Sequence, residues 1–259
     1  MSSHSIHSHT SAVDLGLTEE EAEIIDNVTA HAYDQSGCRM IQRKLEDLST
    51  CSPNFTKMLV QSMLHIMPEV MTNQFGNYLC QKMIEVSDNE QVTMILNSVL
   101  SRCVEVSYNV HGTRVIQTLV EIMSQRHLSM HNQLLSLIEQ MKDHVLDLAT
   151  HTHGNHVIQA FLVSFKSSDR PSDIDQPGSE QRALYTQFIF ESCMTYCKEI
   201  GSHKHGCCVM QRCLEKGRMS QKLDLADVII QKLSSLIEDP YGNYLVQNVL
   251  KLDRADRNE

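Results

Sequence analysis

Six short segments of the chain carry the same kind of polar and flat side chains at the same distances from a glycine. Counted from that glycine, position +5 is glutamine every time. Position +1 is asparagine, cysteine or threonine, and position +2 is arginine, tyrosine or histidine in five of the six segments. The triplets at +1, +2 and +5 are Cys38–Arg39–Gln42, Asn77–Tyr78–Gln81, Thr113–Arg114–Gln117, Asn155–His156–Gln159, Cys207–Cys208–Gln211 and Asn243–Tyr244–Gln247.

The chemistry of this triplet suits the recognition of one flat heterocycle. The glutamine carboxamide offers an acceptor oxygen and two N–H donors, and the flat side chain at +2 offers a stacking surface. On a helix, +1 and +5 are four residues apart and share a face, while +2 is rotated from +1 by about 100°. The spacing therefore predicts a socket in which +1 and +5 read the edge of a ring and +2 stacks on its face.

The elements that position these triplets are helices in a tandem repeat. The glycines stand at 37, 76, 112, 154, 206 and 242, so the steps are 39, 36, 42, 52 and 36 residues and the basic period is about 36. Positions +3, +4 and +8 are apolar in every segment and position +7 in all but the first, where it is Lys44, which is the pattern of a buried helical stripe. Three residues before the glycine, four segments have Asp or Asn, which predicts an N-cap, and the other two have His151 and His203.

Further amphipathic stretches, at 54–67 and 89–100, lie between these helices. Each repeat is then a small helical unit that cannot bury its apolar face alone, so stacked repeats are expected to form an all-α solenoid. Packed helices lie about 8–10 Å apart. With one flat side chain between successive bases, the bases would repeat about every 7 Å, close to one base per repeat.

Composition limits the other classes. The chain has 259 residues, 41% hydrophobic and 21% charged, which is globular. Its net charge of −10 argues against a protein that holds nucleic acid by bulk charge, although it leaves room for a local basic stripe. No secretory signal and no run of 18 apolar residues is present, so no membrane segment is expected. The nine cysteines are expected to be reduced, as in an intracellular protein.

The chain is predicted to divide into a disordered N-terminal tail, 1–16, and a repeat domain, 17–259. A capping box at Thr18 and Glu21 marks the first helix of that domain. The segment 166–182 is polar, contains Pro and Gly, and accounts for the 52-residue step. It is predicted to be an exposed loop between the fourth and fifth repeats.

Metal binding and catalysis are not expected. Cys193, Cys197, His203 and His205, with Cys207 and Cys213 nearby, form no C-x2-C pairing, and the repeat register assigns Cys207 to a socket. The histidines of the tail, His4, His7 and His9, are expected to belong to a disordered polar segment. No phosphate loop, HExxH motif or nucleophile–base arrangement is present, so no cofactor and no enzyme activity are predicted.

The runs G-N-Y-x-x-Q, G-C-R-x-x-Q and G-N-H-x-x-Q resemble the base-reading helices of Pumilio/PUF RNA-binding repeats, and the resemblance extends over about residues 20–251. It implies a right-handed, crescent-shaped α-solenoid of three-helix repeats that binds single-stranded RNA, each repeat reading one base. The eighteen triplet residues would then be the RNA-binding residues. The family usually has eight repeats, so the resemblance also implies that the last two are missing from this chain.

The resemblance also implies which base each socket takes. Asn with Gln would read uracil, Cys with Gln adenine, and Thr with Gln also adenine, with the RNA running antiparallel to the repeats. The expected element is 5′-UAUAUA-3′, from the sixth repeat to the first, which is the 3′ part of a UGUA-type element. Cys208 departs from the pattern, because a thiol cannot stack as arginine or an aromatic ring does.

The role implied by the resemblance is post-transcriptional control in the cytoplasm. A monomer would bind 3′ untranslated regions and recruit repressor or deadenylase proteins through its outer surface, causing translational repression or mRNA decay. The alternative is a helical-repeat scaffold that binds proteins and has lost RNA reading. Gln at +5 in six of six repeats favours RNA, because a solvated face would vary among Lys, Glu, Ser and Gln.

Overall fold

The computed structural model describes residues 16–166 and 179–255. In these residues the regular structure is helical and no strand occurs. The chain forms two compact units, residues 1–98 and 99–259. The predicted all-α fold of tandem repeats is confirmed, while its handedness and crescent form remain predictions.

The helices follow one another as a long, a short and a third helix, and the third carries the reference glycine in its first turn. Along the described residues the order is α1 Glu19–Asp26, α2 Val28–Tyr33, α3 Gln35–Glu46; α4 Phe55–Met63, α5 Met67–Met71, α6 Gly76–Val86; α7 Asn89–Val99, α8 Cys103–Tyr108, α9 Gly112–Gln125; α10 His131–Met141, α11 Val145–Thr150, α12 Gly154–Ser164; α14 Ser179–Thr195, α15 Cys197–Gly201, α16 Gly206–Lys216; α17 Met219–Gln231, α18 Leu233–Leu236, α19 Gly242–Ala255. Short 3-10 turns occur at Leu48–Thr50, Leu64–Ile66, Leu100–Arg102 and Lys142–His144. The three-helix repeat is therefore confirmed.

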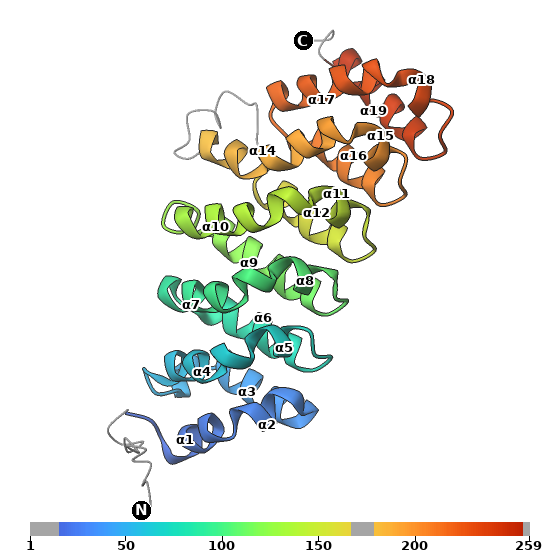
Figure 1. The fold of residues 1–259 in the computed structure, drawn as a ribbon. Helices are drawn as coiled ribbons and strands as arrows, with labels where there is room; N and C mark the ends of the chain where they lie inside the picture. The colour runs from blue at the N-terminus through green and yellow to red at the C-terminus, as the bar shows by residue number, and fades with distance from the viewer. Residues whose placement is uncertain (1–15, 167–178, 256–259) are drawn as a thin grey trace, which may run out of the picture. The chain divides into compact units, whose positions relative to one another are not determined.

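In the first unit, α3 packs along α6, α2 packs against both of them, and α5 packs against α6 (Figure 1, blue to cyan). The apolar stripe of the third helix forms the core: Leu79, Met83 and Ile84 are completely buried. This agrees with the pattern read from the sequence, in which +3, +7 and +8 face inward.

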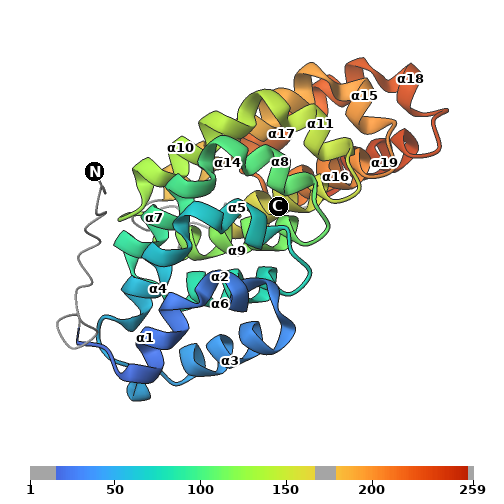
Figure 2. The ribbon, with the colours of Figure 1, turned by 60° about the horizontal axis from the view of Figure 1, so that its bottom comes forward.

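In the second unit, α9 packs on α12, α12 on α16, and α16 on α19. Figure 2 shows α16 and α19 next to each other. Each of these third helices also packs against the short helix that precedes it in the chain. The third helices of this unit therefore lie side by side, and residues at equivalent positions on them follow one another from repeat to repeat.

Glycine is required where the third helix meets the short helix. A Cβ at Gly206 would lie 2.2 Å from the carbonyl oxygen of Ile200, and a Cβ at Gly76 would lie 2.8 Å from that of Val70. Any larger residue would push the two helices apart. The glycine that anchors the sequence repeat is thus explained by the close approach of two backbones.

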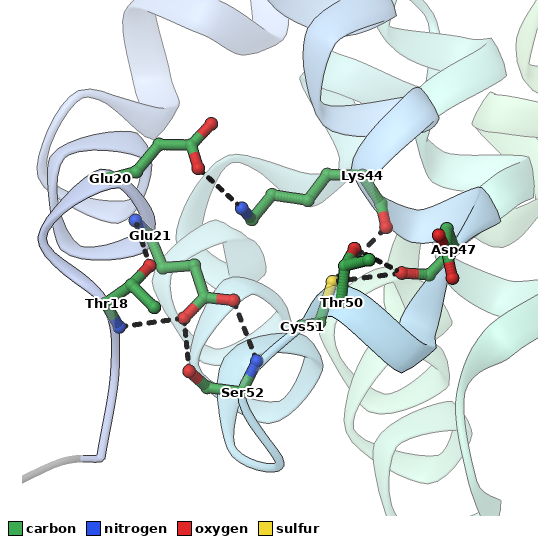
Figure 3. A network of polar contacts seen from close by, with 8 residues as sticks. All are labelled: Thr18, Glu20, Glu21, Lys44, Asp47, Thr50, Cys51 and Ser52. Carbon is green, nitrogen blue, oxygen red and sulfur yellow. Dashed lines mark hydrogen bonds and ion pairs between the residues drawn. The ribbon is translucent and has the colours of Figure 1, made fainter.

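The predicted capping box at the start of α1 is confirmed. The Glu21 N–H donates to Thr18 Oγ1, and the Thr18 N–H donates to Glu21 Oε2 at 2.9 Å. Glu21 is fully buried and also accepts from the Ser52 N–H and hydroxyl, so it joins α1 to the segment before α4 (Figure 3). Burial by itself raises the pKa of Glu21, but the hydrogen bonds from Ser52 and Thr18 outweigh burial and lower it.

Helix α14 begins at Ser179, so the last four residues of the predicted loop 166–182 are helical. Their sequence, Ser-Glu-Gln-Arg, contains three good helix formers, which explains the earlier start. Most of the predicted loop and the tail, at 167–178 and 1–15, lie outside the described residues. Among the described helices, none combines the length and the apolar character needed to cross a membrane.

Candidate nucleic-acid interface

The start of each third helix is fixed by a side chain three residues before the glycine. Asn73 Oδ1 accepts from the N–H groups of Phe75 and Gly76 at 2.8 and 3.0 Å. Asn109 and Asp239 accept the equivalent pair of bonds at their own helices, and Asp34 accepts from the Gly37 N–H. The predicted caps are confirmed, and they set the direction in which +1, +2 and +5 leave the helix.

The two histidines at this position cap their helices through a ring nitrogen. His151 Nδ1 accepts from the N–H groups of His153 and Gly154 at 3.1 and 3.2 Å, and His203 Nδ1 accepts from the His205 N–H at 3.2 Å. A ring nitrogen that accepts carries no proton, so in this arrangement Nδ1 of both rings is the unprotonated nitrogen. Histidine can therefore replace Asn here.

The three members of the triplet differ in exposure. The +2 side chain is exposed in all six repeats, and Tyr78 and Tyr244 have 56% and 55% of their surface accessible. The glutamine at +5 is half-buried in five repeats and exposed at Gln247. The +1 side chain is buried in five repeats and half-buried at Asn243. The surface open to a ligand thus consists mainly of +2 and +5.

The glutamine at +5 is linked to the residue at +1, with which it shares a face as the spacing predicts. Gln81 Nε2 donates to Asn77 Oδ1 at 3.1 Å, and Gln159 Nε2 donates to Asn155 Oδ1 at 2.8 Å. In the third repeat, Gln117 Nε2 donates to the Thr113 carbonyl at 3.0 Å. These bonds orient the carboxamide before any ligand is present.

The side-chain amide of the asparagine at +1 is fixed by hydrogen bonds to backbone carbonyls. Asn77 Nδ2 donates to the carbonyls of Asn73 and Gln74 at 2.9 and 3.0 Å, and Asn155 Nδ2 makes the equivalent pair of bonds. Both N–H groups of this amide are used, so Oδ1 is the atom turned toward Gln. Such a site presents a fixed acceptor beside the glutamine carboxamide, which itself both donates and accepts.

The cysteines at +1 are neutral thiols. Burial, with a smaller effect of Asp34, raises the pKa of Cys38 to about 11, and its thiol donates to the carbonyls of His31 and Ala32. Burial and then Cys208 raise the pKa of Cys207 to about 11 as well. At these two sockets the glutamine therefore stands beside a small uncharged group in place of a fixed amide.

A pocket of about 270 Å³ in the first unit gathers one complete triplet. Its lining contains Cys38, Arg39 and Gln42 from α3, and Tyr78 and the preceding Phe75 from the next repeat. The exposed +2 side chains of two successive repeats thus border one space, with the +1 and +5 residues of the first repeat at its wall. The volume is somewhat below the roughly 300–1,000 Å³ of drug-sized sites, as a single heterocycle requires.

Two lining residues of this pocket, Gln35 and Phe75, were not among the candidates from the sequence. A signal for Phe75 exists in the repeat alignment. The residue directly before the glycine is flat in five repeats, namely Phe75, His111, His153, His205 and Tyr241, and is Ser36 in the first. This recurrence is weaker than that of glutamine at +5, which occurs in all six repeats.

The fifth socket has unusual surroundings. Cys208 is exposed and its thiol donates to the Lys204 carbonyl, so it offers no stacking plane. His205 lies beside His203 with ring centroids 5.6 Å apart, and its Nε2 is buried without a hydrogen-bond partner among the described residues. Burial lowers the pKa of His205, and the nearby Lys204, His203, His156 and His151 lower it further.

The cysteine-rich region around the fifth repeat belongs to the core. Cys193, Cys197 and Cys213 are buried, and burial raises the pKa of Cys213 well above its ordinary value. Within residues 16–166 and 179–255, no three His, Cys, Asp or Glu side chains are grouped so that they could hold a metal ion.

Comparison with known proteins gives one family. A sequence model described as the Pumilio-family RNA binding repeat matches six segments, at 32–61, 67–100, 102–130, 144–170, 196–230 and 234–257. Curated relatives include a Pumilio domain-containing protein of Schizosaccharomyces pombe, 30% identical over 90% of this chain, and putative pumilio homolog 8, chloroplastic, of Arabidopsis thaliana, 35% identical over 85%. The chain spans only 31% and 39% of the length of these two relatives.

Solved structures agree with this result. The Puf4 RNA binding domain bound to a 3′ UTR recognition sequence of HO endonuclease RNA is 31% identical, with a TM-score of 0.72 over 88% of this chain. The RNA-binding domain of yeast Puf5p bound to AAT2 RNA is 27% identical, with a TM-score of 0.71 over the same share. The chain covers 63% and 59% of these two domains.

Proposed function

Because the chain belongs to the Pumilio family of RNA-binding repeat proteins, we propose that it binds single-stranded RNA through its six triplets, one base per repeat. The element is 5′-UAUAUA-3′, read from the sixth repeat to the first. It forms the 3′ part of a UGUA-type element.

The observation that carries this proposal is the pocket of the first unit, where Cys38, Arg39 and Gln42 meet Tyr78. A base in this space lies between the guanidinium of Arg39 and the ring of Tyr78, and its edge faces Gln42. The same relation between one triplet and the next +2 side chain follows wherever third helices pack side by side, as α9, α12, α16 and α19 do.

The hydrogen-bonding groups at +1 and +5 support the assignment of bases. A uracil edge has one N–H between two carbonyl oxygens, so it can donate to Asn77 Oδ1 or to Gln81 Oε1 and accept from Gln81 Nε2. An adenine edge has an amino donor next to a ring acceptor, which a glutamine carboxamide matches without help from its neighbour. The neutral, small Cys38 and Cys207 then leave room for the adenine ring.

Stacking supplies much of the affinity. Each stacked base contributes about 1–3 kcal/mol, so six sites give roughly 6–18 kcal/mol before the RNA and side chains are ordered. This suffices for specific binding by a chain whose net charge is −10. The fifth site contributes less, because Cys208 offers no flat surface.

The biological setting of the proposal is the control of mRNA. Relatives of known structure are bound to RNA, in Puf4 to a 3′ UTR recognition sequence. We extend this to 3′ untranslated regions of cytoplasmic mRNAs, bound by the protein as a monomer and followed by translational repression or decay. Repressor or deadenylase proteins would be recruited by surfaces away from the triplets.

The experiment is fluorescence anisotropy at fixed salt with labelled 5′-UAUAUA-3′ and with 5′-AAAUUU-3′, which has the same composition and is also self-complementary. A third RNA, 5′-UGUAUAUA-3′, tests for contacts beyond the sixth socket. Each mismatched contact costs about 1–3 kcal/mol, so preference for 5′-UAUAUA-3′ should exceed tenfold. Equal, weak binding of all three would contradict RNA reading and favour the protein-binding scaffold.

A further inference from the structure

A second cavity in the first unit shares one wall with the pocket just described. It has a volume of about 620 Å³, and its lining includes Arg39, Arg43 and Lys44 of α3, together with Glu20 and Asp47. Arg39 lines both this cavity and the 270 Å³ pocket that contains Tyr78. The guanidinium of Arg39 therefore separates a space suited to a base from a second, basic space.

The cationic groups of this cavity differ in how they are engaged. Lys44 Nζ forms an ion pair with Glu20 at 2.9 Å, so its charge is largely neutralised within the protein (Figure 3). Arg39 and Arg43 make no ion pair within the described residues, and both are exposed. In a chain of net charge −10, two neighbouring unneutralised guanidinium groups are a local exception.

Arg43 differs from the basic residues at the equivalent position of two other repeats. It stands at position +6, where the second repeat has Lys82 and the fifth has Arg212. Lys82 pairs with Glu85 at 2.9 Å and Arg212 pairs with Glu215 at 3.2 Å, in each case three residues further along the helix. Glu46 occupies the same place after Arg43, yet no such pair forms. The charge of Arg43 is therefore available to a ligand in the cavity.

We propose that this cavity, called here the flanking-phosphate site, holds the phosphate that follows the last base of the element, with Arg43 as its main ligand and Arg39 beside it. A guanidinium group is suited to this because its N–H donors match two phosphate oxygens at once. The inference rests on the proposed function, under which the 3′ end of the RNA lies over the first repeat. The element is then six bases with a charged group fixed at its 3′ side.

The test compares three forms of 5′-UAUAUA-3′ by fluorescence anisotropy at low salt: with a free 3′ hydroxyl, with a 3′ monophosphate, and with a 5′ monophosphate. The 3′ phosphate should raise affinity about three- to fivefold, as expected for a partly exposed charge pair. The gain should disappear in Arg43→Gln and be retained only in part in Arg43→Lys, whose ammonium keeps the charge but cannot match two phosphate oxygens at once. The matched control is Arg212→Gln, at the equivalent position of the fifth repeat, which should keep the full gain.

Two results would overturn the flanking-phosphate site while leaving the proposed function intact. One is selective binding of the hydroxyl form with no gain from the 3′ phosphate. The other is a gain that does not depend on the site, being equal for a phosphate at either end or undiminished in Arg43→Gln, since either form would indicate general attraction. Failure of the proposed function is distinguishable, because the hydroxyl form would then bind no better than 5′-AAAUUU-3′.

Discussion

At the scale of single residues, the asparagine at +1 is the part of the triplet whose environment best explains a preference for one base. Its amide donates to two backbone carbonyls and its oxygen accepts from the glutamine at +5. Asn77→Ser removes that fixed acceptor and leaves a small hydroxyl beside Gln81. We expect the second repeat to change its preference from uracil toward adenine by about tenfold, corresponding to about 1–3 kcal/mol for one base contact.

Anisotropy measurements with 5′-UAUAUA-3′ and 5′-UAUAAA-3′ test this change, because the second repeat faces the fifth base of the element. Asn97→Ser, at an exposed position of α7, is the control and should leave both affinities unchanged. If Asn77→Ser weakens both RNAs by the same factor, the assignment of this residue to base reading is wrong.

The histidines of the second unit make a prediction about pH. The pKa of His205 is lowered in the folded state by burial and by Lys204, His203, His156 and His151. The unfolded chain therefore binds the proton more tightly, so the stability from His205 is complete above the ordinary histidine value of about 6.5 and is lost as the pH falls below it.

Thermal melting at pH 7.5 and pH 5.5 measures this effect. The loss of Tm on acidification should be smaller in His205→Phe than in the unmodified protein, and Phe is the residue found at the same position of the second repeat, Phe75. His65→Phe makes the same change at an exposed histidine and should keep the full loss. An identical loss in both variants would exclude His205 as a source of pH dependence.

Much of the triplet arrangement could be read from the sequence at this scale, and the missing parts have physical causes. The recurrence of Gln at +5 and the one-residue offset of Tyr78 from Asn77 predict that Tyr78 points away from the face shared by +1 and +5. Tyr78 is exposed and Asn77 is buried. The burial of Asn77 could not be foreseen, because it depends on carbonyl groups of its own helix start. The cap by His151 requires that Nδ1 of its ring carry no proton, and the sequence does not specify which ring nitrogen is protonated.

At the scale of helices, the short and the third helix of the repeat approach each other closely at the glycine that begins the third helix. In Gly206→Ala, the new Cβ would meet the Ile200 carbonyl oxygen at 2.2 Å, and a backbone atom cannot move aside without displacing its helix. We expect destabilisation of about 1–3 kcal/mol or more, in the range of overpacked sites. Chemical denaturation gives the free energy of unfolding.

Gly201→Ala provides the comparison for that measurement. Its Cβ would lie 3.0 Å from a Leu245 methyl and 3.2 Å from a Leu236 methyl, which are ends of side chains that can shift. The loss of stability should therefore be clearly smaller than in Gly206→Ala. Equal losses would mean that the close backbone approach is not what requires glycine.

The position of the first helix depends on Glu21, which is buried. Its carboxylate accepts hydrogen bonds from Thr18 and from Ser52, which lies between α3 and α4. Glu21→Gln should reduce stability by about 1–3 kcal/mol, because an amide cannot accept all of these bonds. Since the pKa of Glu21 is lowered, its contribution is present above about pH 4.3 and is lost as the pH falls through its folded value. Denaturation at pH 7 checks the variant, and the exposed Glu19→Gln should have little effect.

Helix positions were largely predictable, since the apolar stripe and the caps agree with α6 and α9 to within the first turn. The predicted stretches 54–67 and 89–100 contain α4 and α7. The start of α14 inside the expected loop was missed because Pro and Gly lower the helix signal of the whole segment. Local composition thus locates helix interiors better than helix ends.

At the scale of the whole molecule, the charge of −10 predicts how RNA binding responds to salt. If edge contacts and stacking dominate, few phosphate groups are neutralised, and the slope of log K against log salt should be about −2, equivalent to about three phosphate contacts. Anisotropy from 50 to 300 mM salt measures the slope. A slope equivalent to many phosphate contacts would contradict edge reading as the main source of affinity.

The glycine at the start of the third helix also has a consequence for exchanging repeats between proteins. In five of the six repeats, the carbonyl that this glycine approaches belongs to the residue six positions earlier, as in Gly76 with Val70 and Gly206 with Ile200. A recombined chain therefore takes the glycine and the carbonyl that it approaches from the same parent protein only if the recombination point lies outside the segment between these two residues. A graft joined at Ser87 and Asp88, between α6 and α7, transfers the matched pair intact, whereas one joined within 70–76 combines surfaces that were never fitted to each other.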